Sequence, residues 1–178
     1  FERQVRRWTR QLRASPGALI PELERLADWL AAELPGDDGH VTVAHGDFRL
    51  GNLMFYPTEP RVIGILDWEL STLGHPLADL GFACMTWHCA PDEYGGILGL
   101  DLAGLGIPSK AEFVAHYMAH AQPTAQLTDF HVIFALFRFA VIFVGIADRA
   151  KAGNAAGNNV DDLAPLARSF ALRGLALI

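Results

Sequence analysis

Cysteine and positive charge are both scarce in this sequence. Its 178 residues include two cysteines, Cys84 and Cys89, which are too few for a disulfide framework and lack the spacing of a metal site. This cysteine usage favours a reduced, cytoplasmic setting. The formal net charge of −6 argues against a nucleic-acid-binding surface. The early basic residues are scattered around one predicted helix and indicate a solvated face: Arg3, Arg6, Arg7, Arg10 and Arg13.

Charged residues are also few, at 19%, whereas hydrophobic residues make up 51%, which excludes disorder for most of the chain. A length of 178 residues suits one domain with a sizeable core. The one long apolar run, Phe130 to Ala147, is interrupted by His131 and Arg138. A mid-bilayer arginine is costly, so we expect a buried core helix rather than a membrane span. Arg138 should then pair with a carboxylate, because an unpaired buried charge is expensive.

Signals for export and for phosphate-binding loops are missing as well. No secretory signal is visible, and the chain opens at Phe1 rather than Met, so we expect a piece of a longer protein. The Gly- and Leu-rich stretch from Ala90 to Pro108 has no Gly-Lys-Ser/Thr ending, which argues against a P-loop. A long ordered loop or lid is the better interpretation of that stretch.

Apolar spacing and turn residues predict a mostly helical α+β domain with a small β element. Ser109 and Glu112 form a predicted capping box, and Thr128 or Asp129 is expected to cap the long apolar helix. A flexible connection is predicted at 153–159 and a loop at 68–76. The predicted helices are 1–14, 18–34, 76–88, 110–121, 129–152 and 161–177. The predicted strands are 41–44, 53–56 and 62–66, the last two joined by a hairpin turn at 57–60.

Three polar residues follow predicted strands and point to phosphate chemistry. Asp47 and Asn52 lie in the loop between the first two strands, and Asp67 follows the third. Asp47 could accept the proton of an attacking hydroxyl, while the Asn52 amide oxygen and the Asp67 carboxylate suit Mg²⁺. The alternative is that Asp47 and Asn52 only organise a turn, as these residues often do.

The run His45-Gly46-Asp47-x-x-x-x-Asn52, followed by Ile65-Leu66-Asp67-Trp68-Glu69, resembles the signature of aminoglycoside phosphotransferase-family, protein-kinase-like enzymes. Further stretches resemble the branch that is fused to acyl-CoA dehydrogenases in animals and free-standing in bacteria. These stretches are Phe55 to Pro60, Leu70 to Gly74, Pro76 to Leu80, Gly104 to Phe113 and Phe137-Arg138. The likeness covers roughly residues 40–150 and implies an ATP- and Mg²⁺-dependent phosphotransferase.

The resemblance also implies roles for individual residues. Asp47 matches the catalytic aspartate, and Asn52 and Asp67 match the two Mg²⁺ ligands that hold the cofactor. Arg49 lies where protein kinases place a lysine near the transferred phosphate; the alternative is a structural salt bridge. Glu69 matches a glutamate of choline kinases and is either a second metal or substrate contact or a structural residue.

Three further residues are expected to support the loop. His45 should hold it through hydrogen bonds rather than shuttle protons. Asp79 should brace it from the following helix, with Arg138 nearby. Relatives in this branch usually carry aspartate where Gly51 and His75 stand here, a departure that affects loop stiffness or substrate preference rather than the metal ligands.

A larger departure lies upstream of residue 40, where we find no Gly-rich phosphate loop, strand lysine or partner glutamate. The resemblance therefore implies that residues 1–178 form the C-terminal lobe only, without the N-terminal lobe that cradles ATP. We expect weak ATP binding and little or no kinase activity from this chain alone.

The expected partner is a small molecule with a hydroxyl acceptor, not a nucleic acid or a membrane; the oligomeric state stays open. Acidic residues near the 90–108 loop would suit a cationic acceptor such as an aminoglycoside or choline, whereas the branch resembled favours a hydroxyacyl-CoA-like metabolite. Two rivals stay open, a non-catalytic pseudokinase-type binding module and a kinase-fold nucleotide hydrolase.

Overall fold

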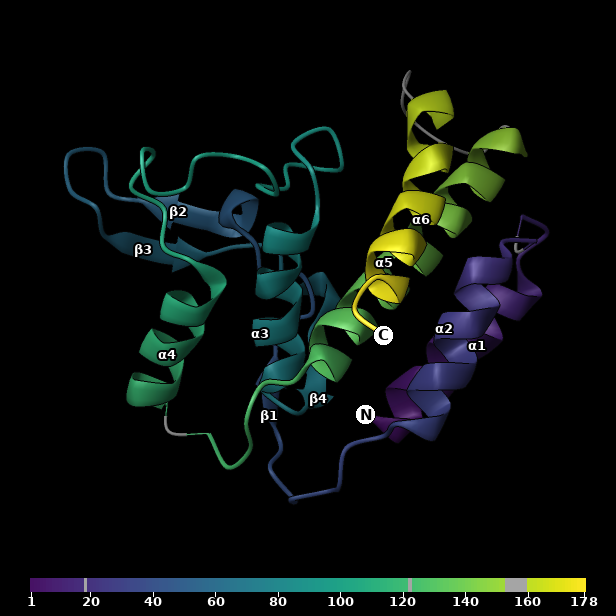
Figure 1. Cartoon of the computed structure of the whole chain (residues 1–178), viewed down its shortest axis with the longest axis horizontal. Coiled ribbons are helices and arrows are strands. Elements are labelled where there is room, and N and C mark those ends of the chain that lie inside the picture. Colours follow the sequence, from purple (N-terminus) through teal and green to yellow (C-terminus); the bar gives the residue numbers. More distant parts are fainter. Residues whose placement is uncertain (18, 122, 153–159) are drawn as a thin grey trace.

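A computed structural model describes residues 1–17, 19–121, 123–152 and 160–178, with the side chains of 160–164 left aside. The predicted flexible connection at 153–159 lies outside the described residues. Two helices open the chain, α1 (Glu2–Ala14) and α2 (Pro21–Ala32). They lie side by side at one edge of the molecule (Figure 1). The second helix begins later than predicted, at Pro21, because proline fits the first helical turn, where no N–H partner is needed.

The core is organised around α5 (Asp129–Lys151), which packs against α1, α2, α3 (Leu77–Cys84) and α6 (Val160–Leu175). It is long and apolar enough to cross a membrane by length and composition, but 78% of its most apolar window is buried within the protein. Its side chains are enclosed on nearly all faces, with Ile133, Leu136 and Phe137 fully buried. The prediction of a core helix is confirmed.

Within the described residues the β element consists of two two-stranded antiparallel sheets. β2 (Leu53–Phe55) and β3 (Val62–Ile65) form the predicted hairpin. β1 (Thr42–Ala44) pairs instead with β4 (Thr72–Gly74), so the predicted loop at 68–76 is wrong. Before β4 the chain also makes a 3₁₀ turn, η2 (Trp68–Leu70). A strand of three residues is too short to show an alternation of apolar and polar side chains in the sequence. β4 forms only because it pairs with β1, which lies far away in the sequence.

Two caps and one loop follow the sequence expectations. At the start of α4 (Lys110–Ala121) the Ser109 N–H and hydroxyl donate to the Glu112 carboxylate at 2.8 and 2.7 Å, and the Glu112 main-chain N–H donates to the Ser109 hydroxyl at 3.2 Å. Thr128 caps α5, and its N–H donates to His131 Nδ1 at 3.0 Å. The helix predicted at 76–88 divides into α3 and the 3₁₀ turn η3 (Met85–His88). The 90–108 stretch contains turns but no long helix or strand.

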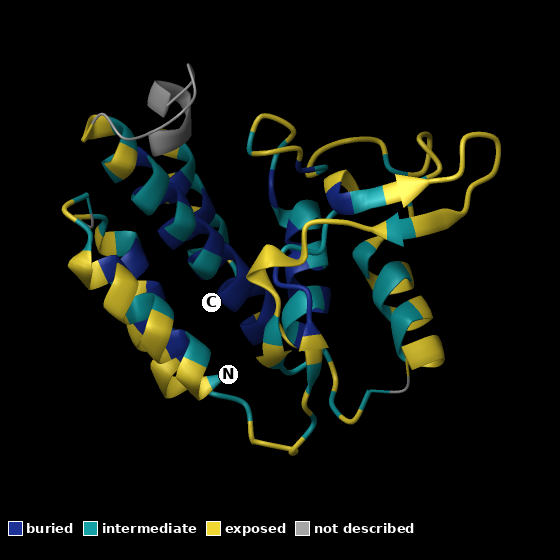
Figure 2. Cartoon of the chain, turned by 180° about the vertical axis from the view of Figure 1, so that it is seen from behind, coloured by how far each residue is buried: buried dark blue, intermediate teal, exposed yellow. Residues whose placement is uncertain are grey.

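Burial is uneven across the molecule (Figure 2). The helices around α5 enclose the core, whereas the β2–β3 hairpin carries apolar side chains that remain open to solvent. Ile63 of β3 is 46% exposed and Phe55 of β2 is 48% exposed. The catalytic-loop candidates lie between these two regions, on the segments that enter and leave the short strands.

Candidate active site

The loop that leaves β1 and enters β2 is held by main-chain hydrogen bonds to a carboxylate. The N–H groups of His45 and Gly46 donate to the two oxygens of Asp79 on α3, at 2.6 and 2.8 Å. Arg138 of α5 donates to the Gly46 carbonyl oxygen from the other side. A carboxylate that accepts two N–H bonds makes strong, charge-assisted contacts. Asp79 and Arg138 therefore fix the loop from two different helices.

Gly46 is required by the geometry of this loop. Its φ is +84°, in the region that side chains other than glycine rarely adopt. A Cβ placed there would lie 2.4 Å from the carbonyl oxygen of Leu70. Because that obstacle is backbone, which cannot rotate aside, the close approach of the loop to η2 depends on glycine.

Asp67 is brought beside the loop by its neighbour Leu66. The N–H of Leu66 donates to the Asn52 carbonyl oxygen at 2.8 Å, and its own carbonyl oxygen lies 2.8 Å from His45 Nε2. His45 Nδ1 accepts the Asp47 N–H at 3.1 Å, so the proton of the neutral ring is on Nε2, which donates to Leu66. His45 is 2% exposed. Its ring ties the loop to the segment that carries Asp67.

Asp47 and Asn52 contact each other directly. Asn52 Nδ2 donates to the Asp47 carbonyl oxygen and to Asp47 Oδ2, both at 2.8 Å. Asn52 is 5% exposed, whereas the Asp47 side chain retains 15% exposure. Because both bonds go through Nδ2, the amide orientation is defined and Oδ1 is the atom left for another partner.

Asp67 and Glu69 are exposed residues on the segment that begins η2. Asp67 has φ +64° and ψ +58°, a left-handed conformation for a non-glycine residue. Such conformations cost free energy and cluster at functional sites. No hydrogen bond to the Asp67 carboxylate comes from the described residues. An amide oxygen and a carboxylate left free in this way form the kind of hard-oxygen donor set that Mg²⁺ takes together with phosphate oxygens.

Arg49 has two neighbours in the structure. Its Nε lies 3.2 Å from Asp47 Oδ2, and its guanidinium carbon lies 5.5 Å from the ring centroid of Tyr94. The Arg49 side chain is 40% exposed. A Cβ on Gly51 would lie 2.7 Å from Arg49 Nη1, so the glycine leaves the space that the guanidinium occupies. The structure thus brings Asp47, Arg49 and Asn52 together.

Tyr94 is a residue of this region that the sequence did not single out. It also has a left-handed backbone, with φ +61°. Its ring packs edge-on against Phe139 and Phe143 of α5, at centroid distances of 5.1 and 5.4 Å. The only signal in the sequence was the turn composition of Tyr94-Gly95-Gly96, which does not predict where the Tyr94 ring packs. Tyr94 joins the helical core to the arginine beside Asp47.

The carboxylate partner expected for Arg138 is not observed. Among the described residues no carboxylate oxygen lies within 4 Å of its guanidinium, and Nε has no hydrogen-bond partner. The guanidinium carbon lies instead 5.2 and 5.9 Å from the ring centroids of Phe82 and Trp8. Burial lowers the pKa of Arg138, and the charges of Asp79 and Asp47 oppose this shift. A backbone carbonyl and two aromatic faces take the place of the ion pair.

Neither cysteine offers a nucleophile at neutral pH. Cys84 and Cys89 are free and buried. Burial raises the pKa of Cys84 to about 11 and that of Cys89 to about 12, which keeps both thiols protonated. The candidates for reactive groups in this region are therefore the oxygen and nitrogen atoms of the His45–Asn52 loop.

Several known proteins are similar to this chain in sequence. Residues 1–126 match the model of the phosphotransferase enzyme family (APH). Acyl-CoA dehydrogenase family member 10 of Mus musculus is 37% identical over 182 residues, covering 96% of this chain and 17% of that protein. Acyl-CoA dehydrogenase family member 11 of Homo sapiens is 35% identical over 178 residues, covering 99% of this chain and 23% of that protein. The chain thus spans about a fifth of these curated relatives.

A solved structure is also similar. A crystal structure from Ralstonia eutropha JMP134, provisionally described as an aminoglycoside phosphotransferase, superposes with a TM-score of 0.91 at 44% identity. The match covers 99% of this chain and 54% of that one. The expected kinase-like α+β fold is confirmed by this likeness. With the family match over most of its length, the chain belongs to the phosphotransferase enzyme family.

Proposed function

We propose that the full-length protein transfers the γ-phosphate of ATP to a hydroxyl group of a small molecule, with Mg²⁺ as cofactor. The family supports a phosphotransferase of the kinase type. The observation that carries the finer proposal is the clamp on Leu66, which holds Asp67 next to the Asp47–Asn52 pair through two bonds of 2.8 Å. This arrangement supports a site made of one base candidate and two hard-oxygen donors.

Each residue has a distinct task in this proposal. Asp47 orients the acceptor hydroxyl and takes its proton, since its carboxylate is partly exposed and positioned by Asn52. Asn52 Oδ1 and Asp67 would hold Mg²⁺, with Glu69 as an outer contact. When bound, the cation neutralises charge on the phosphate oxygens. Arg49 leaves Asp47 to contact a phosphate or the substrate, and its 40% exposed side chain can turn to do so.

The ATP phosphates are proposed to be held from above by groups outside residues 1–178. The chain covers 54% of the similar Ralstonia protein, and its β2–β3 hairpin exposes apolar side chains beside the loop. We propose that this chain alone acts weakly or not at all. The two free cysteines favour a cytoplasmic setting for the activity.

For the acceptor we favour a hydroxyacyl-CoA-like metabolite over an aminoglycoside- or choline-like alcohol. The support is the similarity to acyl-CoA dehydrogenase family members 10 and 11, at 35–37% identity. The name of the Ralstonia protein supports the second class of acceptor. Phosphate transfer by the full-length protein to a panel of both classes separates them.

The test of the proposal is Asp47→Asn in the full-length protein. Transfer of phosphate should fall by about 10²–10⁴-fold, the usual contribution of a general base. Asp28→Asn is the matched control, because Asp28 is a 79% exposed carboxylate on α2 outside the loop. Circular dichroism checks that both variants remain folded.

Other outcomes would select the rivals. Equal inactivity of wild type and variant across the acceptor panel, with ligand binding retained, identifies a non-catalytic binding module. Loss of ATP without a phosphorylated acceptor identifies a hydrolase. Either result overturns the transferase proposal.

A further inference from the structure

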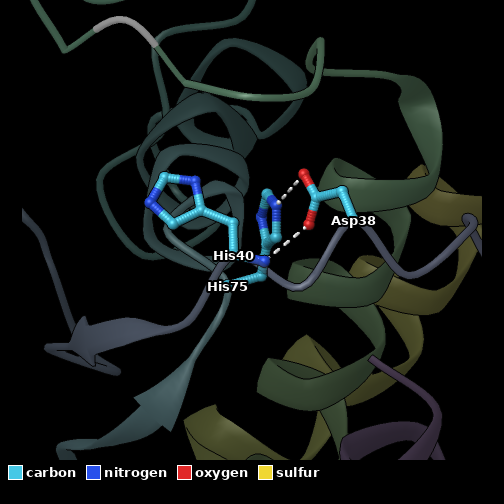
Figure 3. A group of neighbouring side chains, drawn as sticks. All are labelled: Asp38, His40 and His75. Atoms are coloured by element: carbon cyan, nitrogen blue, oxygen red, sulfur yellow. Dashed lines mark hydrogen bonds and ion pairs between the residues drawn. The ribbon is translucent and has the colours of Figure 1, made fainter.

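A second polar cluster lies at the opposite end of the β1–β4 ladder from Asp47. Thr42 of β1 pairs with Gly74 of β4 at that end, whereas His45 follows β1 at the other end. His40 therefore precedes the ladder and His75 follows it. Asp38, two residues before His40, completes the cluster (Figure 3). These side chains take no part in the phosphotransferase site.

The donor atoms of this cluster have the spacing of a small metal site. One potential ligand atom from each of Asp38, His40 and His75 lies within 4.8 Å of the other two. Asp38 Oδ2 and His75 Nε2 are 3.3 Å apart. A tetrahedral zinc ion with bonds of about 2.0–2.1 Å separates its ligand atoms by roughly 3.3–3.4 Å. One edge of such a tetrahedron is already present, and the His40 ring must approach from a distance of at most 4.8 Å to complete the other edges.

The carboxylate of the cluster is held in place by its neighbours. The His40 N–H donates to Asp38 Oδ1 at 3.0 Å, and the Thr124 hydroxyl donates to Asp38 Oδ2. Thr124 Oγ1 also lies 3.0 Å from His40 Nδ1. The Thr124 hydrogen bond is the largest of several effects that lower the pKa of Asp38, so this carboxylate is ionised at neutral pH. Bonds of this kind orient a metal ligand before the metal arrives.

We propose that Asp38, His40 and His75 form a binding site for Zn²⁺. The fourth coordination position would be taken by a water molecule or by the nearby Thr124 hydroxyl. Two imidazoles and one carboxylate are the ligand types of zinc sites. Mg²⁺ is excluded as the occupant because it prefers an all-oxygen octahedral shell. The same site would take Co²⁺, which has similar ligand preferences and a visible spectrum.

Binding requires a change of tautomer at His75. Its Nδ1 accepts the Leu77 N–H at 3.2 Å, so the neutral metal-free ring carries its proton on Nε2. Zinc at Nε2 moves that proton to Nδ1, and the bond to Leu77 is lost. No proton leaves the ring overall, but the exchange removes one cap at the start of α3. We therefore expect a dissociation constant in the micromolar range rather than the tight binding of a preformed four-ligand site.

The site would join three segments that are far apart in sequence. Asp38 and His40 lie on the connection from α2 to β1, His75 on the connection from β4 to α3, and Thr124 on the connection before α5. Zinc would cross-link the first two directly and the third through the Thr124 hydroxyl. A ligand that binds only the folded state raises its stability, so zinc should raise the melting temperature.

The experiment is titration of this chain with Zn²⁺ and Co²⁺, followed by calorimetry and visible absorption, with excess Mg²⁺ to occupy hard-oxygen sites. Wild type should bind one equivalent, and Co²⁺ should give the intense visible bands of tetrahedral coordination. His40→Ala and Asp38→Asn should each weaken binding by at least about tenfold, since each removes one of three ligands. His40→Gln tests the same ligand with less loss of packing.

The matched control is the double variant His116→Ala/His120→Ala. The centroids of those two rings lie 4.1 Å apart on exposed positions of α4, and the pair is the obvious competing site on the surface. The control should retain wild-type binding. Binding that survives in His40→Ala and His40→Gln but is lost in the α4 double variant would overturn the proposal. Absence of one-equivalent binding by folded wild type up to millimolar zinc would overturn it as well.

Discussion

The helical half of the molecule and the His45–Asn52 loop are held together by different forces. The helices α1, α2, α5 and α6 enclose apolar side chains such as Phe137 and Phe170, which are fully buried. The His45–Asn52 loop has little apolar burial and is fixed by hydrogen bonds to Asp79, Arg138 and Leu66. This difference indicates that the stability of the fold, which comes from the helical half, can be changed separately from the geometry of the loop. Apolar burial is non-directional, whereas each hydrogen bond of the loop fixes the distance and direction between two atoms.

The largest expected effect is on the helical half. Phe137→Ala should lower the free energy of unfolding by about 3–5 kcal/mol, because it opens a cavity in a fully enclosed site. Phe55→Ala is the matched control on the β2–β3 hairpin, where the ring is 48% exposed. Its cost should stay below about 1 kcal/mol. Denaturant unfolding measures both, and equal costs would contradict the contrast between the two regions.

The next effect concerns the polar residue inside the helical half. His131 is 2% exposed, and burial lowers its pKa to about 4. The folded state therefore binds this proton less readily than the unfolded state, whose histidine pKa is about 6.5. Stability from this residue is complete above about pH 6.5 and is lost as the pH falls towards 4, by up to about 3 kcal/mol.

His131→Gln tests this pH dependence. Glutamine can keep the reach to Thr128 that the capping box needs and does not titrate. Unfolding free energies measured between pH 7 and 4 should fall less steeply in the variant than in wild type. The same exchange at exposed His116 serves as control. If the unfolding free energy of wild type and of His131→Gln falls equally with pH, another titratable group is responsible for the pH dependence.

Asp79→Asn should act on the loop with a smaller cost, about 1–3 kcal/mol. Each Asp79 oxygen accepts one main-chain N–H, from His45 or from Gly46. In the asparagine variant the NH₂ group replaces one of these oxygens, so that one N–H loses its acceptor. Glu112→Gln is the matched control, because both Ser109 bonds go to Oε2 alone and an amide oxygen can accept them. Hydrogen exchange at the amides of His45 and Gly46 should rise only in Asp79→Asn. Unchanged protection there would remove Asp79 from its bracing role.

The smallest effect lies where the two regions meet. Tyr94 packs on Phe139 and Phe143 and lies against Arg49, so Tyr94→Ala should release the arginine. A cation–π contact at an exposed site is worth about 0.5–1 kcal/mol, which predicts a two- to fivefold loss of phosphate transfer in the full-length protein. Tyr94→Phe keeps the ring and should keep the rate. A loss as large in Tyr94→Phe would assign the effect to the hydroxyl.

Local patterns in the sequence were enough to predict the helices, the hairpin and the caps, because apolar spacing and capping residues act within a few positions. The loop residues were also visible as a motif. The sequence did not reveal β4, which forms only by pairing with β1 thirty residues away. It also led to a wrong partner for Arg138, since a backbone carbonyl has no sequence signature. Features that form through contacts between distant residues, such as β4 and the Arg138 hydrogen bond, cannot be predicted from local sequence patterns.

The two hydrogen bonds of Leu66 have a consequence for how this protein can diverge. Both use main-chain atoms, and the Leu66 side chain is 45% exposed. The position of Asp67 therefore depends on the backbone of residue 66 rather than on its side chain. Substitutions at position 66 can be engineered to alter the surface around the site while both bonds that place the following carboxylate are retained.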